Sequence, residues 1–343
     1  MYFFYLLLQL LTTSTALAYP SAPLNDRLIK TVYQFPNETW VENLAIRPNG
    51  KILATLIGSP DLWQIDPKSK DAQLITSFPN ATSTLGIAEV REDFFAVAVG
   101  NWSYVTFSTT PGSYSIWTID LSAATTSQPC GRVVKITDVP QAGFLNGLCS
   151  VPGQPDTVLV GDSDKGVIYQ INLARRSSSI WLDDPAFKPN TTVAAQLGIN
   201  GIHSHGGYLY FVNSFLRPTI GRVPINKHGK PAGPVERVID QSPWPSNTGD
   251  HGDDFAFDKD GNMWVTADPS NLLVKVNVAK RTSVIVAGGL NDRNIAGDTA
   301  AAFGRTNEDE NVLYITTNGG IAYPRKTGVE GGKIAALDIS RLR

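Results

Sequence analysis

The sequence predicts an all-β protein, a six-bladed β-propeller closed by an N-terminal strand in the last blade. Three observations predict it: a strand–turn motif recurs six times, its copies start near positions 42, 86, 146, 200, 253 and 299, and helical periodicity is nearly absent. Each copy has a short apolar strand, a turn with Gly, Asp or Asn, a β-rich strand, a second turn and a third strand. Repeats of about 40 to 50 residues with several strands each are typical of propeller blades.

The segment that precedes the first copy indicates how the ring closes. Residues 26–35, DRLIKTVYQF, have the composition of one more β-strand. We expect this strand to be the outer strand of the last blade, so that both parts of the chain tie the ring shut. Residues 19–343 are therefore predicted to form one propeller domain.

The first 18 residues have the pattern of a signal peptide. An apolar run from Tyr2 to Leu11 is followed by small residues and by Ala16-Leu17-Ala18, although no positive charge precedes the run. The run is much shorter than the ~20 residues that cross a bilayer, so no membrane span is expected in the mature chain. A secreted protein, or one that works in the lumen of the secretory pathway, is predicted.

Other residues agree with an oxidising, glycosylating compartment. Four N-x-S/T sequons predict glycosylation at Asn37, Asn80, Asn101 and Asn190. Cys130 and Cys149 are the only cysteines and could form one disulfide. We favour two unpaired thiols, because Gly147-Leu148-Cys149 looks like a buried inner strand.

Composition and missing motifs exclude several functional classes. The net charge of -2 gives no basic footprint for nucleic acid. The chain has no G-x-S-x-G elbow, no H-E-x-x-H helix motif, no clustered cysteines, no dinucleotide fingerprint and no phosphate loop. Small-molecule substrates are the expected partners.

The residue just before each innermost strand is expected at the mouth of the central channel. Those positions are Glu42, Thr84 or Leu85, Asn146, Asn200, Asp253 and Thr299. Carboxylate and amide oxygens from different blades suit a hard cation such as Ca²⁺ or a polar substrate. Polar residues at strand starts also serve turns, but four of six being Glu, Asn, Asn and Asp favours a site.

Histidines cluster at two neighbouring blade starts. His251 and Asp254 flank Asp253 in the stretch GDHGDDFAFDKDG, and His203 follows Asn200. Imidazoles here could act as general acid–base groups near neutral pH. His205, beside two glycines, is expected in a turn, as are the segments 258–261 and 162–166, which lack the later ligands of a calcium loop.

Aromatic residues in the expected loops could wall an apolar pocket, although packing between blades is the favoured explanation for at least half of them. These residues are Trp102, Tyr104, Phe107, Tyr114, Phe144, Phe215, Trp244 and Tyr323.

The stretches ENLAIRPNGKILATL, NGLCSVPG, NGIHSHGGYLYFVNS and DDFAFDKDGNMWVT resemble the regucalcin/gluconolactonase superfamily of six-bladed propellers. The resemblance implies a divalent cation, Ca²⁺, held by Glu42, Asn200 and Asp253, with Asn146 as a substrate contact, in a lactonase or esterase. Here Asp254 and Phe255 follow Asp253, where those lactonases usually have Gly.

Within that superfamily, the leader and the opening W-x-E-N-L-A-I-R-x-N-G, from Trp40 to Gly50, look like a fungal branch. That branch contains hetero-Diels–Alderases of tropolone–sesquiterpenoid biosynthesis, which dehydrate a hydroxymethyl tropolone to a quinone methide and direct its cycloaddition to a humulene-type olefin.

The favoured hypothesis is therefore a secondary-metabolite pericyclase without a cofactor, acting on apolar polyketide and terpenoid molecules. Its roles are assigned as follows: His251, Asp253 and His203 are candidate catalytic residues, and Glu42, Asn146, Asn200 and Asp254 are candidate substrate-binding residues. A Ca²⁺-dependent lactonase and a non-catalytic propeller that binds a ligand or partner are the alternatives.

Overall fold

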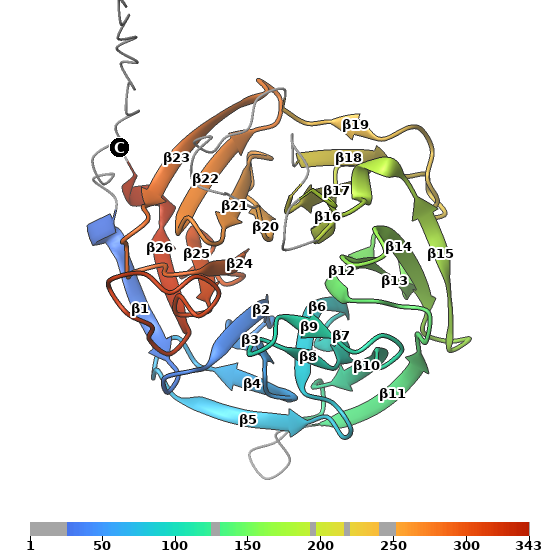
Figure 1. The fold of residues 1–343 in the computed structure, drawn as a ribbon, viewed down its shortest axis with the longest axis horizontal. Coiled ribbons are helices and arrows are strands. Elements are labelled where there is room, and N and C mark those ends of the chain that lie inside the picture. Colours follow the sequence, from blue (N-terminus) through green and yellow to red (C-terminus); the bar gives the residue numbers. More distant parts are fainter. Residues whose placement is uncertain (1–25, 125–130, 193–196, 216–219, 240–251, 343) are drawn as a thin grey trace, which may run out of the picture.

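Six four-stranded antiparallel sheets stand around a central channel and form a closed ring (Figure 1). The computed structural model describes residues 26–124, 131–192, 197–215, 220–239 and 252–342. The strand order in each sheet is sequential from the channel outward in the first five blades. The predicted six-bladed propeller is confirmed.

The strands and short 3-10 helices have the following bounds. Blade 1 contains β2 (Trp40–Ile46), β3 (Ile52–Ile57), β4 (Asp61–Ile65) and β5 (Ala72–Ser77). Blade 2 contains β6 (Ser83–Arg91), β7 (Phe94–Gly100), β10 (Ser115–Asp120) and β11 (Arg132–Asp138), with the hairpin β8 (Trp102–Ser103) and β9 (Ser108–Thr109) inserted. Blade 3 contains β12 (Leu145–Val151), β13 (Gln154–Asp162), β14 (Val167–Asn172) and β15 (Ser177–Asp183), followed by η2 (Pro185–Phe187).

The second half of the ring repeats this plan. Blade 4 contains β16 (Ile199–His205), β17 (Tyr208–Asn213), β18 (Ile220–Pro224) and β19 (Glu236–Arg237). Blade 5 contains β20 (Phe255–Phe257), β21 (Met263–Ala267), β22 (Leu272–Asn277) and β23 (Thr282–Gly288). Blade 6 contains β24 (Asp298–Phe303), β25 (Val312–Thr317), β26 (Lys333–Asp338) and the N-terminal β1 (Ile29–Gln34), with η1 (Asp26–Leu28) before β1 and η3 (Ile339–Arg341) after β26.

The ring closes in blade 6 as the sequence predicted. Strand β1 pairs antiparallel with β26, with Ile29 opposite Leu337, and it occupies the outer edge of that sheet. Because the first and last described strands share a sheet, the ring has no open seam between its ends.

Blades 1 to 5 each have a fourth strand that the three-strand motif did not predict. These outer strands are largely exposed; in β5 one side chain of six is buried, that of Ile75. A strand with so little buried surface has only a weak apolar pattern, so the sequence does not predict it.

The apolar core is divided among the interfaces between blades. Among the described residues, six clusters of buried side chains each join adjacent blades, including the closing pair, blades 6 and 1, and the cluster between blades 2 and 3 also takes in Trp40 and Ile57 of blade 1. Each sheet therefore buries both faces against its neighbours, while its edges face the channel and the solvent.

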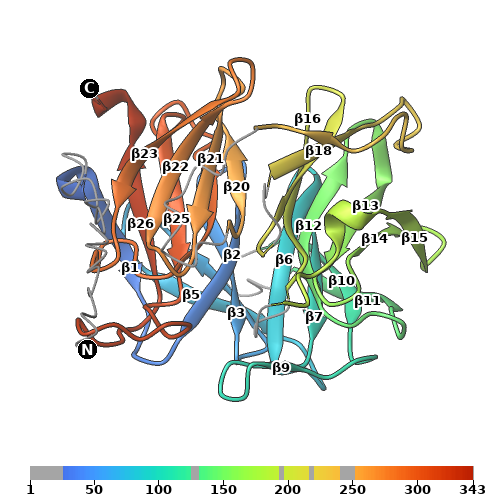
Figure 2. The ribbon, with the colours of Figure 1, turned by 45° about the horizontal axis from the view of Figure 1, so that its top comes forward.

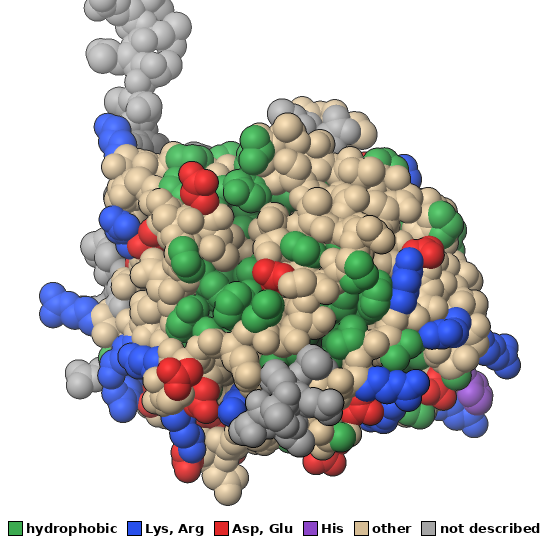
Figure 3. Space-filling view, turned by 90° about the horizontal axis from the view of Figure 1, so that it is seen from below, with side chains coloured by type: hydrophobic (Ala, Val, Ile, Leu, Met, Phe, Trp, Pro, Cys, Tyr) green, Lys and Arg blue, Asp and Glu red, His purple; other side chains and the backbone are tan. Residues whose placement is uncertain are grey.

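The tilted view places the β8–β9 hairpin at one end of the channel (Figure 2). On the side wall shown in Figure 3, Lys and Arg lie beside Asp and Glu, with apolar side chains between these groups. In the part of the chain that the structure describes, no helix has the length and apolar character needed to cross a membrane.

Candidate active site at the channel mouth

A β-bulge opens the innermost strand of most blades and directs one side chain into the channel mouth. The pairing of the first two strands shifts register after Val41, Thr84, Leu145, Ile199 and Asp298. In blade 5, Asp253 and Asp254 precede β20 but still exchange backbone hydrogen bonds of 2.9 and 3.0 Å with Thr266. A bulge re-aims a side chain that a regular strand would alternate away.

The bulges correct one detail of the sequence interpretation. Glu42, Asn146 and Asn200 lie inside their strands, and only Asp253 precedes its strand. Four of the six predicted positions, Glu42, Asn146, Asn200 and Asp253, nevertheless converge on one pocket, whereas Thr299 is buried outside its lining. Blade 2 contributes Leu85 at this position, which is buried.

Threonine hydroxyls on the second strands stabilise three of these irregular segments. Thr55 Oγ1 accepts from the backbone N–H of Asn43 at 3.0 Å, and Thr316 Oγ1 accepts from that of Ala300 at 3.0 Å. Thr266 Oγ1 accepts from the N–H of Asp254 at 3.2 Å. An N–H left unpaired in a buried bulge would destabilise the fold, so these hydroxyls stabilise the bulges by accepting from it.

A pocket lies above the bulges, with about 630 Å³ of empty space that includes open solvent at its mouth. Its polar lining is Glu42, Asn146, Asn200, Ser214, Asp253 and Asp268. Its apolar lining is Trp40, Ile57, Trp102, Phe107, Phe144, Leu197, Phe215, Ala322 and Tyr323. None of its described lining residues is Lys, Arg or His.

Glu42 and Asp253 are the carboxyls at the base of the pocket. Glu42 Oε2 accepts from Trp40 Nε1 at 2.6 Å, and Asp253 Oδ1 accepts from Asn200 Nδ2 at 2.6 Å. Burial raises the pKa of Glu42 from 4.5 to about 8, assisted by the charge of Asp268 and opposed by the Trp40 bond. Burial also raises the pKa of Asp253 well above its usual range, and the charge of Glu42 adds to the rise.

Asp268 is a third carboxyl in this pocket, and sequence reasoning missed it. It directly follows β21, accepts from Asn318 Nδ2 at 3.0 Å, and burial raises its pKa to about 7. In the sequence, Asp268 could be recognised as the polar residue directly after the second strand of a blade. Second strands run antiparallel to first strands, so they end where first strands begin, at the same mouth.

The aromatic wall comes mainly from the β8–β9 hairpin and its neighbours. The Trp102 ring stacks on Phe144 at 5.8 Å and meets Trp40 and Phe107 edge-on at 5.6 and 5.7 Å. Phe107 has a positive φ of 47° and is 55% exposed at the mouth.

The remaining predicted aromatics have mixed positions. Phe215 and Tyr323 line the pocket, and Trp244 lies outside the described residues. Tyr114 is buried in the cluster between blades 2 and 3, and Tyr104 packs against Gly58. Five of the eight aromatic residues therefore line the pocket and two serve packing.

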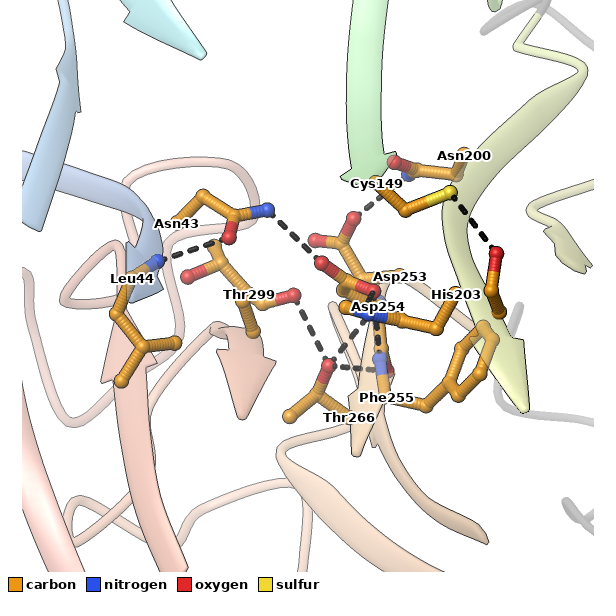
Figure 4. Close-up of polar contacts among 12 residues, drawn as sticks. Asn43, Leu44, Cys149, Asn200, His203, Asp253, Asp254, Phe255, Thr266 and Thr299 are labelled. Carbon is orange, nitrogen blue, oxygen red and sulfur yellow. Dashed lines mark hydrogen bonds and ion pairs between the residues drawn. The ribbon is translucent and has the colours of Figure 1, made fainter. Parts of the chain in front are cut away.

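His203 and Asp254 do not join this lining. Asp254 Oδ1 lies 2.8 Å from His203 Nε2, and Asp254 Oδ2 accepts from Asn43 Nδ2 at 2.8 Å, inside the channel (Figure 4). Asp253 instead reaches Asn200 in the same view. His251 lies outside the described residues.

The two Asp-rich segments are turns, as predicted. Asp258 accepts from the backbone of Asp260 and Asn262, and Gly166 N–H reaches Asp162 O at 2.8 Å. His205 is instead the last residue of β16, before the turn, and its ring stacks on Phe257 at 4.2 Å.

The predicted thiols and sequons have the following positions. Cys149 is buried and free, and Cys130 lies outside the described residues. Asn37 and Asn80 are exposed, whereas Asn101 and Asn190 are half-buried, and the buried Oδ1 of Asn101 has no partner among described groups.

The predicted calcium ligands, Glu42, Asn200 and Asp253, are hydrogen-bonded to other side chains or to one another. Asn200 presents its amide nitrogen to Asp253, and the indole of Trp40 occupies Glu42 Oε2. Within the described ranges, no three His, Cys, Asp or Glu side chains are grouped to hold one ion. Ca²⁺ takes six to eight oxygens, so these residues would have to reorient to hold the ion, and calcium binding by Glu42, Asn200 and Asp253 stays a prediction.

Fold and site together define a six-bladed propeller with an acidic, aromatic-walled pocket for a small molecule at one end of its channel. Regucalcin from Agrobacterium tumefaciens, a calcium-binding protein, has a similar structure, with a TM-score of 0.62 and 14% identity over 90% of this chain and 92% of that one. This likeness shows the shared fold.

Two curated fungal proteins are similar along most of the sequence. A Phoma protein named "Putative hetero-Diels-Alderase" is 32% identical over 323 residues, 86% of this chain and 87% of the relative. A Sarocladium schorii protein, "Putative hetero-Diels-Alderase asR5", is 25% identical over 84% of this chain and 77% of its own length. No protein-family model matches the chain. The chain belongs to the hetero-Diels–Alderase family.

Proposed function

We propose that the protein is a fungal secondary-metabolite hetero-Diels–Alderase that dehydrates a hydroxymethyl tropolone to a quinone methide and directs its cycloaddition to a humulene-type sesquiterpene. The names of its relatives support the reaction class. The observation that carries the proposal is the division of the pocket, with three carboxyls and two amides at its base and aromatic side chains around them.

The carboxyls supply the acid and the base for the loss of water. Burial raises the pKa of both Glu42 and Asp253, and the charge of Glu42 raises that of Asp253 further, so near neutral pH the pair retains at least one proton. The protonated member donates its proton to the leaving hydroxyl as the C–O bond breaks, and the ionised member takes the proton of the ring hydroxyl. One water leaves, and the pair ends with the same number of protons. His251 remains a predicted partner of Asp253 in this exchange.

The aromatic walls then serve the cycloaddition, which forms one C–C and one C–O bond and loses no atoms. Holding the two reactants in one orientation converts a bimolecular step into an effectively unimolecular one. Trp102, Phe107 and Tyr323 offer flat apolar surface for the hydrocarbon partner, and Asn146 and Asn200 offer hydrogen bonds to the tropolone oxygens. The mechanism assigns no step to a metal.

The protein is further proposed to pass through the secretory pathway after removal of residues 1–18. The exposed sequons at Asn37 and Asn80 are the best placed for glycans. This part rests on the sequence pattern and is independent of the chemistry.

The test is a single incubation with two readouts. Purified protein is mixed with a hydroxymethyl tropolone and humulene, and the adduct is measured by mass and by enantiomeric ratio. The expected result is a faster reaction and one enantiomer, since the uncatalysed reaction gives both equally. Asp253→Asn should slow it by about 100-fold or more, while Asp260→Asn, an exposed position in the same blade, should not.

Two outcomes would contradict the proposal. A racemic adduct formed at the rate of the protein-free control would exclude pericyclase activity on these partners. Hydrolysis of aromatic or sugar lactones that stops on addition of EDTA would favour the lactonase instead.

A further inference from the structure

At the second residue of each bulge, four blades have Gly or Ala and two have a polar residue. The six successive positions are Asn43, Gly86, Gly147, Gly201, Asp254 and Ala300. Three are glycines because neighbouring inner strands approach closely there: a Cβ on Gly86 would lie 2.6 Å from Leu148 N, and one on Gly201 would lie 2.6 Å from Asp254 Cα. Polar side chains occur only in blades 1 and 5 of this described ring.

Those two polar side chains bind each other across the channel. Asn43 Nδ2 donates to Asp254 Oδ2 at 2.8 Å, although the residues are 211 positions apart and blade 6 lies between their blades. Asn43 is 7% exposed and Asp254 is 4% exposed. Figure 4 shows the bond spanning from β2 to the start of blade 5.

The other oxygen of Asp254 is held from blade 4. Oδ1 accepts from the backbone N–H of Phe255 at 2.8 Å and lies 2.8 Å from His203 Nε2. The His203 ring meets Phe255 edge-on at 4.8 Å, which limits its rotation. A buried carboxylate with three partners in three blades has one orientation available to it.

Asp253 is coupled to this arrangement through the backbone. Its carbonyl accepts from Gly201 N–H at 2.9 Å, and its carboxyl is bonded to Asn200, the first residue of the same bulge. One peptide unit joins Asp253 and Asp254, and their side chains extend toward different partners, Asn200 and Asn43 (Figure 4). Fixing the Asp254 side chain toward the channel therefore keeps the Asp253 carboxyl in the pocket.

We infer that Asn43, His203 and Asp254 form a cross-channel bracket, a set of positioning residues that orient Asp253. The inference rests on the proposed function only for its activity readout. It reassigns His203 and Asp254 from the predicted catalytic and substrate-binding roles to positioning.

The test uses Asn43→Ala and His203→Gln, with Ser204→Ala as the matched control beside His203, since Ser204 bonds to Ser150 O outside the bracket. Each bracket variant should lower kcat by about 10- to 100-fold with little change in KM, because a small misplacement of a reacting group has that effect. The control should keep the wild-type kcat. Thermal melting verifies that each variant is folded, and His203→Gln carries the test if Asn43→Ala does not fold.

A double mutant separates positioning from a general structural role. In the Asp253→Asn background, Asn43→Ala should cause no further loss of kcat, because the group that it orients has gone. Additive losses, or unchanged kcat in both folded single variants, would overturn the bracket.

An NMR measurement that needs no enzyme activity tests the bracket independently of the proposed function. In ¹³C-Asp-labelled protein, the Asp253 carboxyl resonance, assigned by its loss in Asp253→Asn, should move in Asn43→Ala and stay in Ser204→Ala. If the wild type forms no adduct but the resonance moves, the proposed function fails and the bracket stands. A resonance that does not move in Asn43→Ala refutes the bracket.

Discussion

Replacing Glu42 by Gln should make the protein more stable at pH 8 and leave it nearly unchanged at pH 5. The side chain is 6% exposed, and its pKa is about 8 in the fold against 4.5 for an ordinary Glu. The fold therefore favours the protonated form. The stability that the protonated Glu42 side chain contributes is fully present below pH 4.5. It is lost as the pH rises through about 8, because only the unfolded chain releases this proton readily.

The magnitude follows from those two pKa values. One pKa unit corresponds to about 1.4 kcal/mol, so the full difference lowers the free energy of unfolding by about 5 kcal/mol above pH 8. Water entering the pocket relieves part of this, and about 2 to 5 kcal/mol is expected. Gln accepts the Trp40 indole bond as Glu does, so Glu42→Gln removes the charge and keeps that contact.

The assay is urea unfolding at pH 5, 6, 7 and 8 in EDTA, which removes any calcium from the comparison. The variant and wild type should coincide within about 1 kcal/mol at pH 5 and diverge steadily toward pH 8. Glu308→Gln, at a side chain that is 72% exposed, is the control and should show no divergence. A constant difference between Glu42→Gln and wild type at all four pH values would refute the buried-acid reasoning.

Four further predictions test other parts of the structure. Phe107→Ala should raise KM about 5- to 20-fold and change stability by less than about 1 kcal/mol, because the ring lines the pocket yet is half-exposed; an unchanged KM would remove it from the site. Gly201→Ala should cost about 1 to 3 kcal/mol in urea unfolding, since its Cβ would collide with the Asp254 backbone; wild-type stability would contradict the close packing. EDTA should leave the rate of adduct formation unchanged, and a loss restored by Ca²⁺ would contradict the metal-free mechanism. Glycopeptide mapping should find glycans at Asn37 and Asn80 and none at Asn101, whose side-chain oxygen is buried; an occupied Asn101 would contradict that burial.

The sequence predicts the ring well because the signal is repeated. Six copies of one strand pattern fix the number of blades, and they fix the equivalent positions from which Glu42, Asn146, Asn200 and Asp253 converge on the pocket. An error in one copy is outweighed by the others. The closing strand, residues 29–34, is predicted because it is left over once the copies are aligned.

Depth within the channel is harder to predict. His203 and Asp254 lie one to three residues from pocket residues, and a regular strand gives no reason to separate them from that pocket. Bulges break the period of two, so the residues on either side of each bulge face differently from what simple alternation gives. Asp268 was missed for another reason, since its closeness to Asp253 depends on the return of β21 to the mouth and on no local pattern.

The bulges also separate two demands on the inner strands. The second bulge position is restricted by contact with the next blade, as Gly86 and Gly147 illustrate. The first position lines the pocket in four blades, where the residues are Glu42, Asn146, Asn200 and Asp253, whereas Leu85 and Thr299 are buried at this position in the other two. Natural variation at these four pocket positions could therefore change the chemistry of the site while the glycines that set the spacing of the blades stay the same.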